Sequence, residues 1–395
     1  MIIENFIKGI ELKYKNHYFS GLCFDSTKCK KDNIFFAIKG TEIDGNKFIN
    51  HAIQMGAKTI VSNQKFEGFK RNILFIKSNN VRKSLSKFSY KTYKEKPKNI
   101  IAVTGTNGKS SVADFYFQIL KLNKKRVASI GTLGIKTQNY LKKVSNTTID
   151  PISLSITLNK LKKEKINDVI LEASSHGLKQ NRLDGLKFKT GIFTNLSHDH
   201  LDYHKTFNDY LQSKLYLFKK LLKKNGNIIT DIEISQYKRI KKIALKNRLN
   251  IQTISNNNGD LKIISHEYHN EKQILKIKYN KSVHKFETKL IGKIQIKNIL
   301  MAIIAATKSN LSFKKIINTI KDLKSVRGRL EQIGTIKNNS KVILDYAHTP
   351  DALKNSLISL KEQFKNRKIS IVFGCGGDRD KTKRPMMGKI ANQYC

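Results

Sequence analysis

The stretch Ile100-Ile-Ala-Val-Thr-Gly-Thr-Asn-Gly-Lys-Ser-Ser111 decides the fold of this chain. An apolar, β-branched run leads directly into a glycine-containing turn, and apolar groups recur at helical spacing from Val112 to Leu122. This order of strand, loop and helix is typical of a phosphate-binding loop. The strict pattern of such loops carries a glycine where Val103 stands, so an ordinary glycine-containing β–α turn remains the alternative.

Four residues of this turn suit the binding of phosphate groups. Gly105 and Gly108 allow a tight turn that brings backbone N–H groups against phosphate oxygens. Lys109 offers a positive charge to terminal phosphates, and Ser110 offers a hydroxyl to a magnesium ion.

The composition is that of a globular chain of 395 residues, 39% hydrophobic and 27% charged. That length is enough for two or three domains with cores of their own. No apolar run is long enough to span a bilayer, and the first 18 residues lack the apolar centre of a secretory signal. Cys23, Cys29, Cys375 and Cys395 form no Cys-x-x-Cys pair, which predicts reduced thiols in a cytoplasmic protein.

The charge balance is strongly basic, with 76 Lys and Arg against 30 Asp and Glu and a net charge of +46. Taken alone, this favours a nucleic-acid partner. The basic residues are mostly Lys, however, and they are spread evenly among Asn and Ile, as the codons of an AT-rich genome would produce. We therefore expect no nucleic-acid partner, although a basic surface can still attract an anionic small substrate.

The order of the predicted elements indicates an α/β chain of three parts. We expect domains at 1–97, 98–327 and 328–395, with a polar linker before the phosphate loop. The last part holds too few elements for a stable domain, so we expect an incomplete, Rossmann-like fold that is cut off in mid-domain. Predicted strands lie at 33–39, 59–62, 168–171, 191–194, 226–230, 341–344 and 368–373, a β-rich stretch at 251–290, and helices at 48–56, 153–163, 210–223, 296–309, 314–323 and 351–364.

Polar residues follow several of these strands. Glu172 ends a buried strand, where it is either a magnesium ligand or a carboxylate in solvent. The segment 195–204 holds three His and two Asp, which favours a hard-ion or phosphate site over zinc, with a polar surface loop as the alternative. Arg379 and Arg384 can each clamp a carboxylate or phosphate, or they belong to exposed turns. Nothing local distinguishes Lys214 from the many other lysines.

Together these segments resemble the Mur ligase family, the ATP-dependent amide-bond ligases of peptidoglycan synthesis. The resemblance covers nearly the whole chain in the family's order, and its most specific parts are Asp345-Tyr-Ala-His-Thr-Pro-Asp351 and Gly374-Cys-Gly-Gly-Asp-Arg-Asp380. It implies a three-domain architecture around a P-loop-type parallel sheet. It also implies addition of the third peptide residue, meso-diaminopimelate, to UDP-N-acetylmuramoyl-L-alanyl-D-glutamate through an acyl phosphate. The alternatives are an L-lysine-adding version and a related ligase such as folylpolyglutamate synthase.

The resemblance also implies roles for individual residues, in a cytoplasmic monomer without nucleic-acid or membrane partners. Lys109, His200 and Lys214 would be catalytic, with Lys214 carbamylated, and Mg²⁺ would be held by Ser110, Glu172, His200 and Lys214. ATP would contact Gly105, Thr106, Asn107, Gly108, Lys109, Ser110, Ser111, Asn298, Arg329 and Asp345. The muramoyl-peptide substrate and the incoming diamino acid would contact Phe24, Ser26, Asn146, Thr147, Thr148, Ser174, Gln180, Arg182 and Arg379.

Three departures from the family pattern stand out. Thr27 occupies the position of a family arginine in the uridine-binding segment, and Gly292-Lys-Ile-Gln295 replaces a Gly-x-Phe-Asn pattern before Asn298. The family's Asp-Asn-Pro-Arg motif for the diamino acid would lie beyond Cys395. The choice between diaminopimelate and lysine therefore rests on the sequence around Arg379, which favours diaminopimelate.

Overall fold

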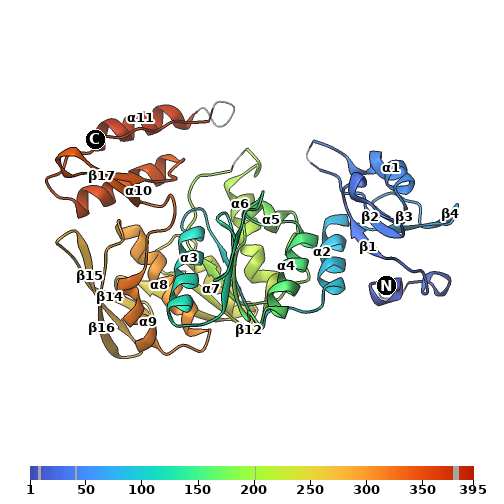
Figure 1. The fold of residues 1–395 in the computed structure, drawn as a ribbon, viewed down its shortest axis with the longest axis horizontal. Helices are drawn as coiled ribbons and strands as arrows, with labels where there is room; N and C mark the ends of the chain where they lie inside the picture. The colour runs from blue at the N-terminus through green and yellow to red at the C-terminus, as the bar shows by residue number, and fades with distance from the viewer. Residues whose placement is uncertain (8–9, 41, 201, 377–381) are drawn as a thin grey trace. The chain divides into compact units, whose positions relative to one another are not determined.

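The computed structural model describes residues 1–7, 10–40, 42–200, 202–376 and 382–395 (Figure 1). The chain forms two compact units. The first holds Met1–Lys96, Ile149–Glu164 and Gly177–Leu186, and the second holds Pro97–Thr148, Lys165–His176 and Lys187–Cys395. Among the described residues, no helix combines the length and the apolar character needed to cross a bilayer.

The first unit is built on a five-stranded sheet with the order β1-β2-β3-β5-β4. All neighbours are parallel except β4 and β5. Its strands are β1 (Gly21–Cys23), β2 (Asn33–Phe36), β3 (Ala57–Ser62), β4 (Gly68–Lys70) and β5 (Ile73–Lys77). Its helices are α1 (Ile49–Gln54), α2 (Val81–Thr92) and α4 (Pro151–Lys163), with short 3₁₀ turns at Ile3–Asn5, Leu12–Tyr14, Ser26–Lys28 (η3) and Gly45–Phe48.

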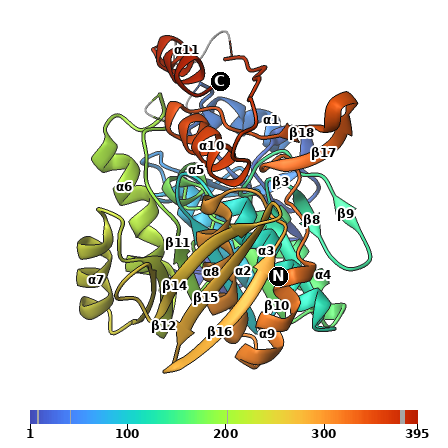
Figure 2. The same cartoon turned by 90° about the vertical axis from the view of Figure 1, so that its left-hand side faces the viewer.

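The second unit is built on an eleven-stranded sheet with the order β16-β15-β14-β13-β12-β11-β6-β10-β7-β8-β9. In this order, all strands from β14 to β7 run parallel to one another, with β6 near the centre. Antiparallel hairpins extend the sheet at both ends. The long ribbons of β14, β15 and β16 are visible side by side in Figure 2. The strands are β6 (Asn99–Thr104), β7 (Val127–Gly131), β8 (Gly134–Lys136), β9 (Leu141–Lys142), β10 (Asp168–Glu172), β11 (Phe188–Phe193), β12 (Leu222–Asp231), β13 (Asn250–Ser255), β14 (Leu261–His269), β15 (Lys272–Tyr279) and β16 (Ser282–Thr288).

The core of this unit lies between the sheet and two long helices, α3 and α8. Every residue of β6 is buried, and α3 and α8 pack on the same apolar cluster as Ile101 and Val103. The phosphate loop therefore leaves the centre of the sheet and enters a buried helix. The helices are α3 (Lys109–Leu122), α6 (Phe207–Tyr216), α7 (Tyr237–Lys246), α8 (Lys293–Thr307), α9 (Phe313–Thr319), α10 (Pro350–Gln363) and α11 (Lys383–Tyr394), with α5 (Ser175–Lys179) shared in sequence by the two units and 3₁₀ turns at Ile320–Asp322 and Lys337–Asn339.

Two sequence predictions about secondary structure are wrong. The helix predicted over 210–223 ends at Tyr216, and one π-helical turn follows at Leu217–Leu221. Leu222 then begins β12, because it pairs with Phe188 of β11. The strand predicted over 368–373 is also absent: β18 (Ser340–Leu344) pairs antiparallel with β17 (Glu331–Ile336), and that segment has no neighbouring strand to bond with.

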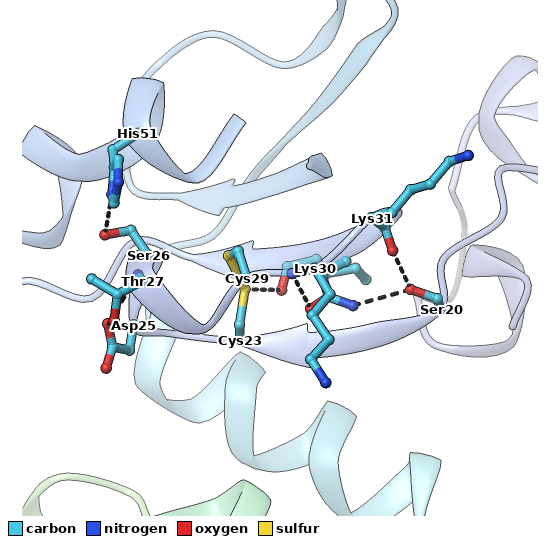
Figure 3. The surroundings of a disulfide bond; sticks show 11 residues. Ser20, Cys23, Asp25, Ser26, Thr27, Cys29, Lys30, Lys31 and His51 are labelled. Carbon is cyan, nitrogen blue, oxygen red and sulfur yellow. Dashed lines mark hydrogen bonds between the residues drawn. A yellow bond between two sulfur atoms is a disulfide. The ribbon is translucent and has the colours of Figure 1, made fainter. Parts of the chain in front are cut away.

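The prediction of reduced cysteines is wrong for one pair. Cys23 and Cys29 form a disulfide, with their Cα atoms 5.7 Å apart (Figure 3). Both side chains are buried in an apolar cluster with Phe35, Ala37 and Ile60. The two cysteines are six positions apart in sequence, and the tight turn between them brings the sulfurs together. Cys375 and Cys395 are free.

Candidate active site

The phosphate loop follows β6 and is held by close backbone approach. Gly105 and Gly108 have φ angles of +147° and +85°, which side chains rarely allow. A Cβ on Gly105 would lie 1.9 Å from Thr194 Oγ1, and one on Gly108 would lie 2.4 Å from Asn298 Oδ1. Asn107 N donates to Asn195 Oδ1 at 2.9 Å, which fixes the outer side of the turn. The loop is therefore shaped by its glycines and by the residues that follow β11.

Two lysines from different elements meet at one carbonyl of this loop. Lys109 Nζ donates to Gly105 O at 3.0 Å, and Lys214 Nζ, from α6, donates to the same oxygen at 2.7 Å. Burial lowers the pKa of Lys109, and the Glu172 carboxylate partly opposes this shift. Burial also lowers the pKa of Lys214 well below its usual value, and the charge of Lys109 lowers it further. Lys214 is 1% exposed and lies over the ring of Tyr210 at 4.3 Å.

A carboxylate and a hydroxyl lie together at the ends of β10 and the phosphate loop. Ser110 Oγ donates to Glu172 Oε2 at 3.0 Å, and Thr132 N donates to Glu172 Oε1 at 2.9 Å. Glu172 is only 2% exposed, so the alternative of a strand-end carboxylate in solvent is wrong. Gly131 leaves room for this carboxylate, because a Cβ there would lie 2.2 Å from Glu172 Oε1. Oxygen ligands of this kind suit Mg²⁺.

His200 belongs to the same site and has an uncommon backbone conformation. Its φ is +54°, a left-handed value that non-glycine residues adopt mostly where the surroundings impose it. Its Nε2 lies 3.3 Å from Asp199 Oδ2, and His348 Nε2 lies 3.9 Å from the same oxygen. Burial lowers the pKa of His200, while Asp199 opposes that shift and Lys109 adds to it. The imidazole is therefore mostly neutral near pH 7, the form that ligates metals.

Three further predicted residues come from α8 and the chain beyond it. Asn298 Nδ2 donates to Gln295 Oε1 at 3.1 Å, beside Gly108. Asp345 accepts from Leu330 N at 3.1 Å and from Ser356 Oγ at 2.7 Å. The Arg329 guanidinium lies over the ring of Tyr346 at 4.6 Å.

Hydroxyl groups line the side of the site near β10. Thr148 Oγ1 donates to Glu172 O at 2.8 Å and accepts from Ser174 N at 2.9 Å. Thr147 Oγ1 lies 3.0 Å from Thr132 Oγ1, and Asn146 Nδ2 donates to Ser145 Oγ at 3.3 Å.

The remaining substrate residues belong to the first unit. Ser26 Oγ lies 2.9 Å from His51 Nδ1, and Phe24 is 41% exposed. Arg182 donates from Nε and from its terminal nitrogen to Gln180 Oε1, at 3.1 and 2.8 Å. Arg379 lies outside the described residues.

One cavity of about 260 Å³ in the second unit collects most of the predicted residues of that unit. Its wall is formed by the phosphate loop, the end of β10, the end of α6, helix α8 and the loop after β18. Gly105, Asn146 and Thr148 are not among the residues that line it. The predicted residues that line it are Thr106, Asn107, Gly108, Lys109, Ser110, Ser111, Thr147, Glu172, Ser174, His200, Lys214, Asn298, Arg329 and Asp345.

The donors of this cavity fit a polyphosphate with a hard cation. Glycines leave space for phosphates, Lys109 supplies charge, and Ser110 and Glu172 supply oxygens. Among the described residues, no three His, Cys, Asp or Glu side chains are grouped so that they could hold a metal ion by themselves.

Two further residues complete this arrangement: Thr132, which no sequence pattern singled out, and Asp199, which belongs to the polar segment 195–204 but has no predicted role of its own. Thr132 holds the Glu172 carboxylate through both its N–H and its hydroxyl. Asp199 faces His200 and His348. Thr132 directly follows Gly131 at the end of β7, and a Gly-Thr pair at a strand end is a signal that could have been used. The pairing of Asp199 with His348 joins residues about 150 positions apart.

Models of one family match along the chain. The Mur ligase family catalytic domain matches residues 18–98, the Mur ligase middle domain matches 103–306, and the Mur ligase glutamate ligase domain matches 328–395. Together they cover most of the sequence.

Curated relatives are more than a third identical to the chain over the region that matches. A protein of Rickettsia prowazekii (strain Madrid E), named UDP-N-acetylmuramoyl-L-alanyl-D-glutamate–2,6-diaminopimelate ligase, is 38% identical over 96% of this chain and 78% of its own length. A protein of Chelativorans sp. (strain BNC1) with the same name is 37% identical over 95% and 77%.

Solved structures show the same fold. A UDP-N-acetylmuramoyl-L-alanyl-D-glutamate–2,6-diaminopimelate ligase matches with a TM-score of 0.82 and 29% identity, over all of this chain and 81% of its own. A complex of FPGS, AMPPCP and folate matches with a TM-score of 0.64 and 15% identity, over 80% of this chain and 83% of its own, which is a likeness of fold alone.

Proposed function

Since the chain belongs to the Mur ligase family, we propose that it is the ATP-dependent ligase that joins meso-diaminopimelate to UDP-N-acetylmuramoyl-L-alanyl-D-glutamate. Relatives named for that reaction, at 37–38% identity over nearly the whole chain, favour it over a folylpolyglutamate synthase. Diaminopimelate rather than lysine is the amino acid in those names.

The reaction has two steps. A carboxylate oxygen of the substrate's glutamate attacks the γ-phosphorus of ATP, and ADP leaves, which gives an acyl phosphate. The amine of the diamino acid then attacks the acyl carbon, phosphate leaves, and the nitrogen loses a proton. Two anions must meet in the first step, so the chain has to supply positive charge at the point of transfer.

Four side chains carry this task in our proposal. Lys109 holds the terminal phosphates, and Ser110, Glu172 and His200 hold Mg²⁺. When bound, the magnesium neutralises charge on the phosphates. Thr132 keeps the Glu172 carboxylate fixed, so that its orientation does not depend on the ligand.

We also propose that Lys214 is carbamylated. An ammonium cannot ligate a cation, whereas a carbamate offers oxygens. Carbamylation needs a neutral amine, and the lowered pKa of this buried lysine supports its presence near pH 7. The carbamate would also replace one of two buried positive charges that share the Gly105 carbonyl.

The remaining site residues are assigned by family position. Thr106, Asn107, Ser111, Asn298, Arg329 and Asp345 contact ATP in this proposal, and Phe24, Ser26, Asn146, Thr147, Thr148, Ser174, Gln180 and Arg182 contact the muramoyl-peptide nucleotide, with Arg379 receiving the diamino acid. We further propose domain boundaries at 97/98 and 327/328 and a cytoplasmic monomer without nucleic-acid partners.

The observation that carries the proposal is the convergence of Lys109, Ser110, Glu172 and Lys214 on one cavity. The test is release of ADP that depends on both the nucleotide substrate and an amino acid. We expect turnover with meso-diaminopimelate and at least tenfold less with lysine. Turnover with a folate and glutamate in place of these substrates would contradict the proposal.

A further inference from the structure

The disulfide of the first unit closes a small loop beside the proposed uridine site. Cys23 is the last residue of β1, and Cys29 directly follows the 3₁₀ turn η3 (Figure 3). The bond therefore ties the turn to the edge strand of the sheet. Each cysteine is 4% exposed, so the bond is part of the packed core rather than a surface link.

The enclosed loop carries the residues assigned to the nucleotide. Phe24 is 41% exposed. Ser26 Oγ lies 2.9 Å from His51 Nδ1 (Figure 3). Asp25 caps the turn by accepting from Thr27 N at 3.1 Å and Thr27 Oγ1 at 2.7 Å. The bonds at Asp25 are local to the turn and do not attach it to the strand.

We propose that Cys23 and Cys29 form a reversible redox modification site, in which the disulfide form holds the uridine-nucleotide substrate more tightly than the dithiol form. This inference rests on the proposed function, since it uses the assignment of Phe24 and Ser26 to that substrate. The proposed location, the cytoplasm, is reducing, and disulfides of cytoplasmic proteins are usually catalytic or redox-sensing rather than structural. No catalytic group lies in this loop, which favours sensing.

The loop has few other attachments that could replace the bond. On the side after Cys29, Lys30 N donates to Asn33 Oδ1 at 3.0 Å, and Asn33 Nδ2 donates to Ser20 Oγ at 3.0 Å. These contacts hold the chain beyond the loop. Within the loop, and among the described side chains, the hydrogen bond between Ser26 and His51 is the one that reaches another element. Reduction would therefore release the turn while the sheet stays intact.

The structure accommodates the reduced form as well. Cys23 Sγ lies 3.5 Å from Ile34 O, which can accept a hydrogen bond from a thiol at that position. Both redox states therefore have a place for the sulfur atoms.

The exchange is a two-electron reaction with a dithiol or its disulfide. A thiolate of the reductant attacks one sulfur, and the Cys23–Cys29 bond breaks to leave a mixed disulfide and one protein thiolate. The second thiolate of the reductant then attacks its own sulfur in the mixed disulfide, and the other protein thiolate leaves. The products are two protein thiols and the reductant's disulfide, so two electrons and two protons pass to the protein. A low-molecular-weight disulfide reverses the reaction.

The burial of the sulfurs predicts how the substrate affects this exchange. A reductant reaches a bond that is 4% exposed only when the loop opens. A nucleotide bound to Phe24 and Ser26 would keep the loop closed. We therefore expect saturating UDP-N-acetylmuramoyl-dipeptide to slow reduction by dithiothreitol about tenfold.

The experiment compares the full chain after oxidation with oxidised glutathione and after reduction with dithiothreitol. Alkylation and peptide mapping report the state of Cys23 and Cys29, with Cys375 and Cys395 as internal free thiols. UDP binding by calorimetry and KM for each substrate are measured in both states. We expect reduction to raise the KM for the uridine nucleotide roughly 3–10-fold, with the KM for ATP and kcat unchanged.

Two variants separate this effect from general oxidation. The double variant Cys23→Ser/Cys29→Ser should match the reduced protein and ignore both reagents, whereas Cys395→Ser should behave as the parent chain. If the double variant does not fold, the reduced parent chain gives the same comparison. Equal UDP affinity in the two redox states, or thiols at both positions that oxidised glutathione never joins, would overturn the proposal. Tighter UDP binding on oxidation without any amide synthesis would sink the proposed function and still support the redox site.

Discussion

Two loops of the second unit share a layout and differ in support. The phosphate loop joins β6 to α3, and the loop at 345–349 joins β18 to α10; both follow a strand and present polar groups at a helix start. Every residue of β6 is buried, whereas no residue of β18 is. Tyr346, in the second loop, is 60% exposed.

The difference lies in what holds each functional group. Lys109 and Glu172 are fixed by buried carbonyls and N–H groups in the main core. Arg329 and Asp345 are held by a two-stranded sheet and small apolar clusters. We infer that the first loop is preorganised for phosphoryl transfer, whereas the second tunes nucleotide binding. Substitutions should therefore cost far more in rate at the first loop than at the second.

The largest effect is expected for Lys109→Ala. Removing one preorganised charge aimed at the transferring phosphoryl group should lower kcat about 10²–10³-fold. Lys121→Ala, on the same helix but exposed, is the matched control and should change kcat less than twofold. Circular dichroism should show both variants folded. A kcat within a few-fold of the parent for Lys109→Ala would remove the phosphate loop from the reaction.

Lys214→Met should separate activity from stability. We expect about 10²-fold loss of kcat, because a carbamate ligand cannot form, and short carboxylates should restore part of it. In buffer freed of CO₂, where the parent chain carries the unmodified amine, we also expect a higher Tm near pH 7 for Lys214→Met, since burying an amine whose pKa is lowered destabilises the folded state.

The pH dependence of that gain has a defined sign. Between the lowered pKa of Lys214 in the fold and its usual value, the unfolded chain binds more protons, so stability rises with pH. The Tm advantage of Lys214→Met should therefore shrink as pH rises through this window. An advantage that is constant with pH would show that burial of the amine does not cause it.

The contrast between the loops also explains what sequence could predict. The strand, the glycines and the helix of the phosphate loop are contiguous, and local pattern is enough to find them. Lys214 has no local signal, because its role depends on α6 bringing its amine to the Gly105 carbonyl from 109 positions away. Only the family resemblance identified it.

The secondary-structure predictions failed where pairing with a distant strand decides whether a segment is a strand. The apolar spacing of 210–223 fits a helix, yet Leu222 pairs with β11 and the helix ends early. The run at 368–373 has strand composition without a partner strand. The cysteine pair shows the same limit, since spacing alone does not reveal that a 3₁₀ turn brings Cys23 to Cys29.

A smaller effect than at either lysine is expected for Glu172→Gln. The amide keeps the shape, and its oxygen can still accept from Ser110, but it loses the negative charge and the bond that Glu172 Oε1 accepts from Thr132 N. The Mg²⁺ concentration for half-maximal rate should therefore rise about tenfold. Glu267→Gln, on β14 and outside the cavity, is the control for loss of one charge. An unchanged Mg²⁺ requirement would mean that this carboxylate is structural, and that metal binding does not distinguish the phosphate loop from the loop at 345–349.

The smallest effect is expected in the second loop, for Tyr346→Leu. The Arg329 guanidinium lies 4.6 Å from this ring, and loss of a partly exposed cation–π contact costs about 0.5–1 kcal/mol. If Arg329 contacts ATP, this should raise the KM for ATP roughly 2–5-fold and leave kcat unchanged. Tyr346→Phe keeps the ring and is the matched control. A fall in kcat of tenfold or more for Tyr346→Leu, with Tyr346→Phe unaffected, would place this exposed loop in the chemical step and erase the difference between the two loops.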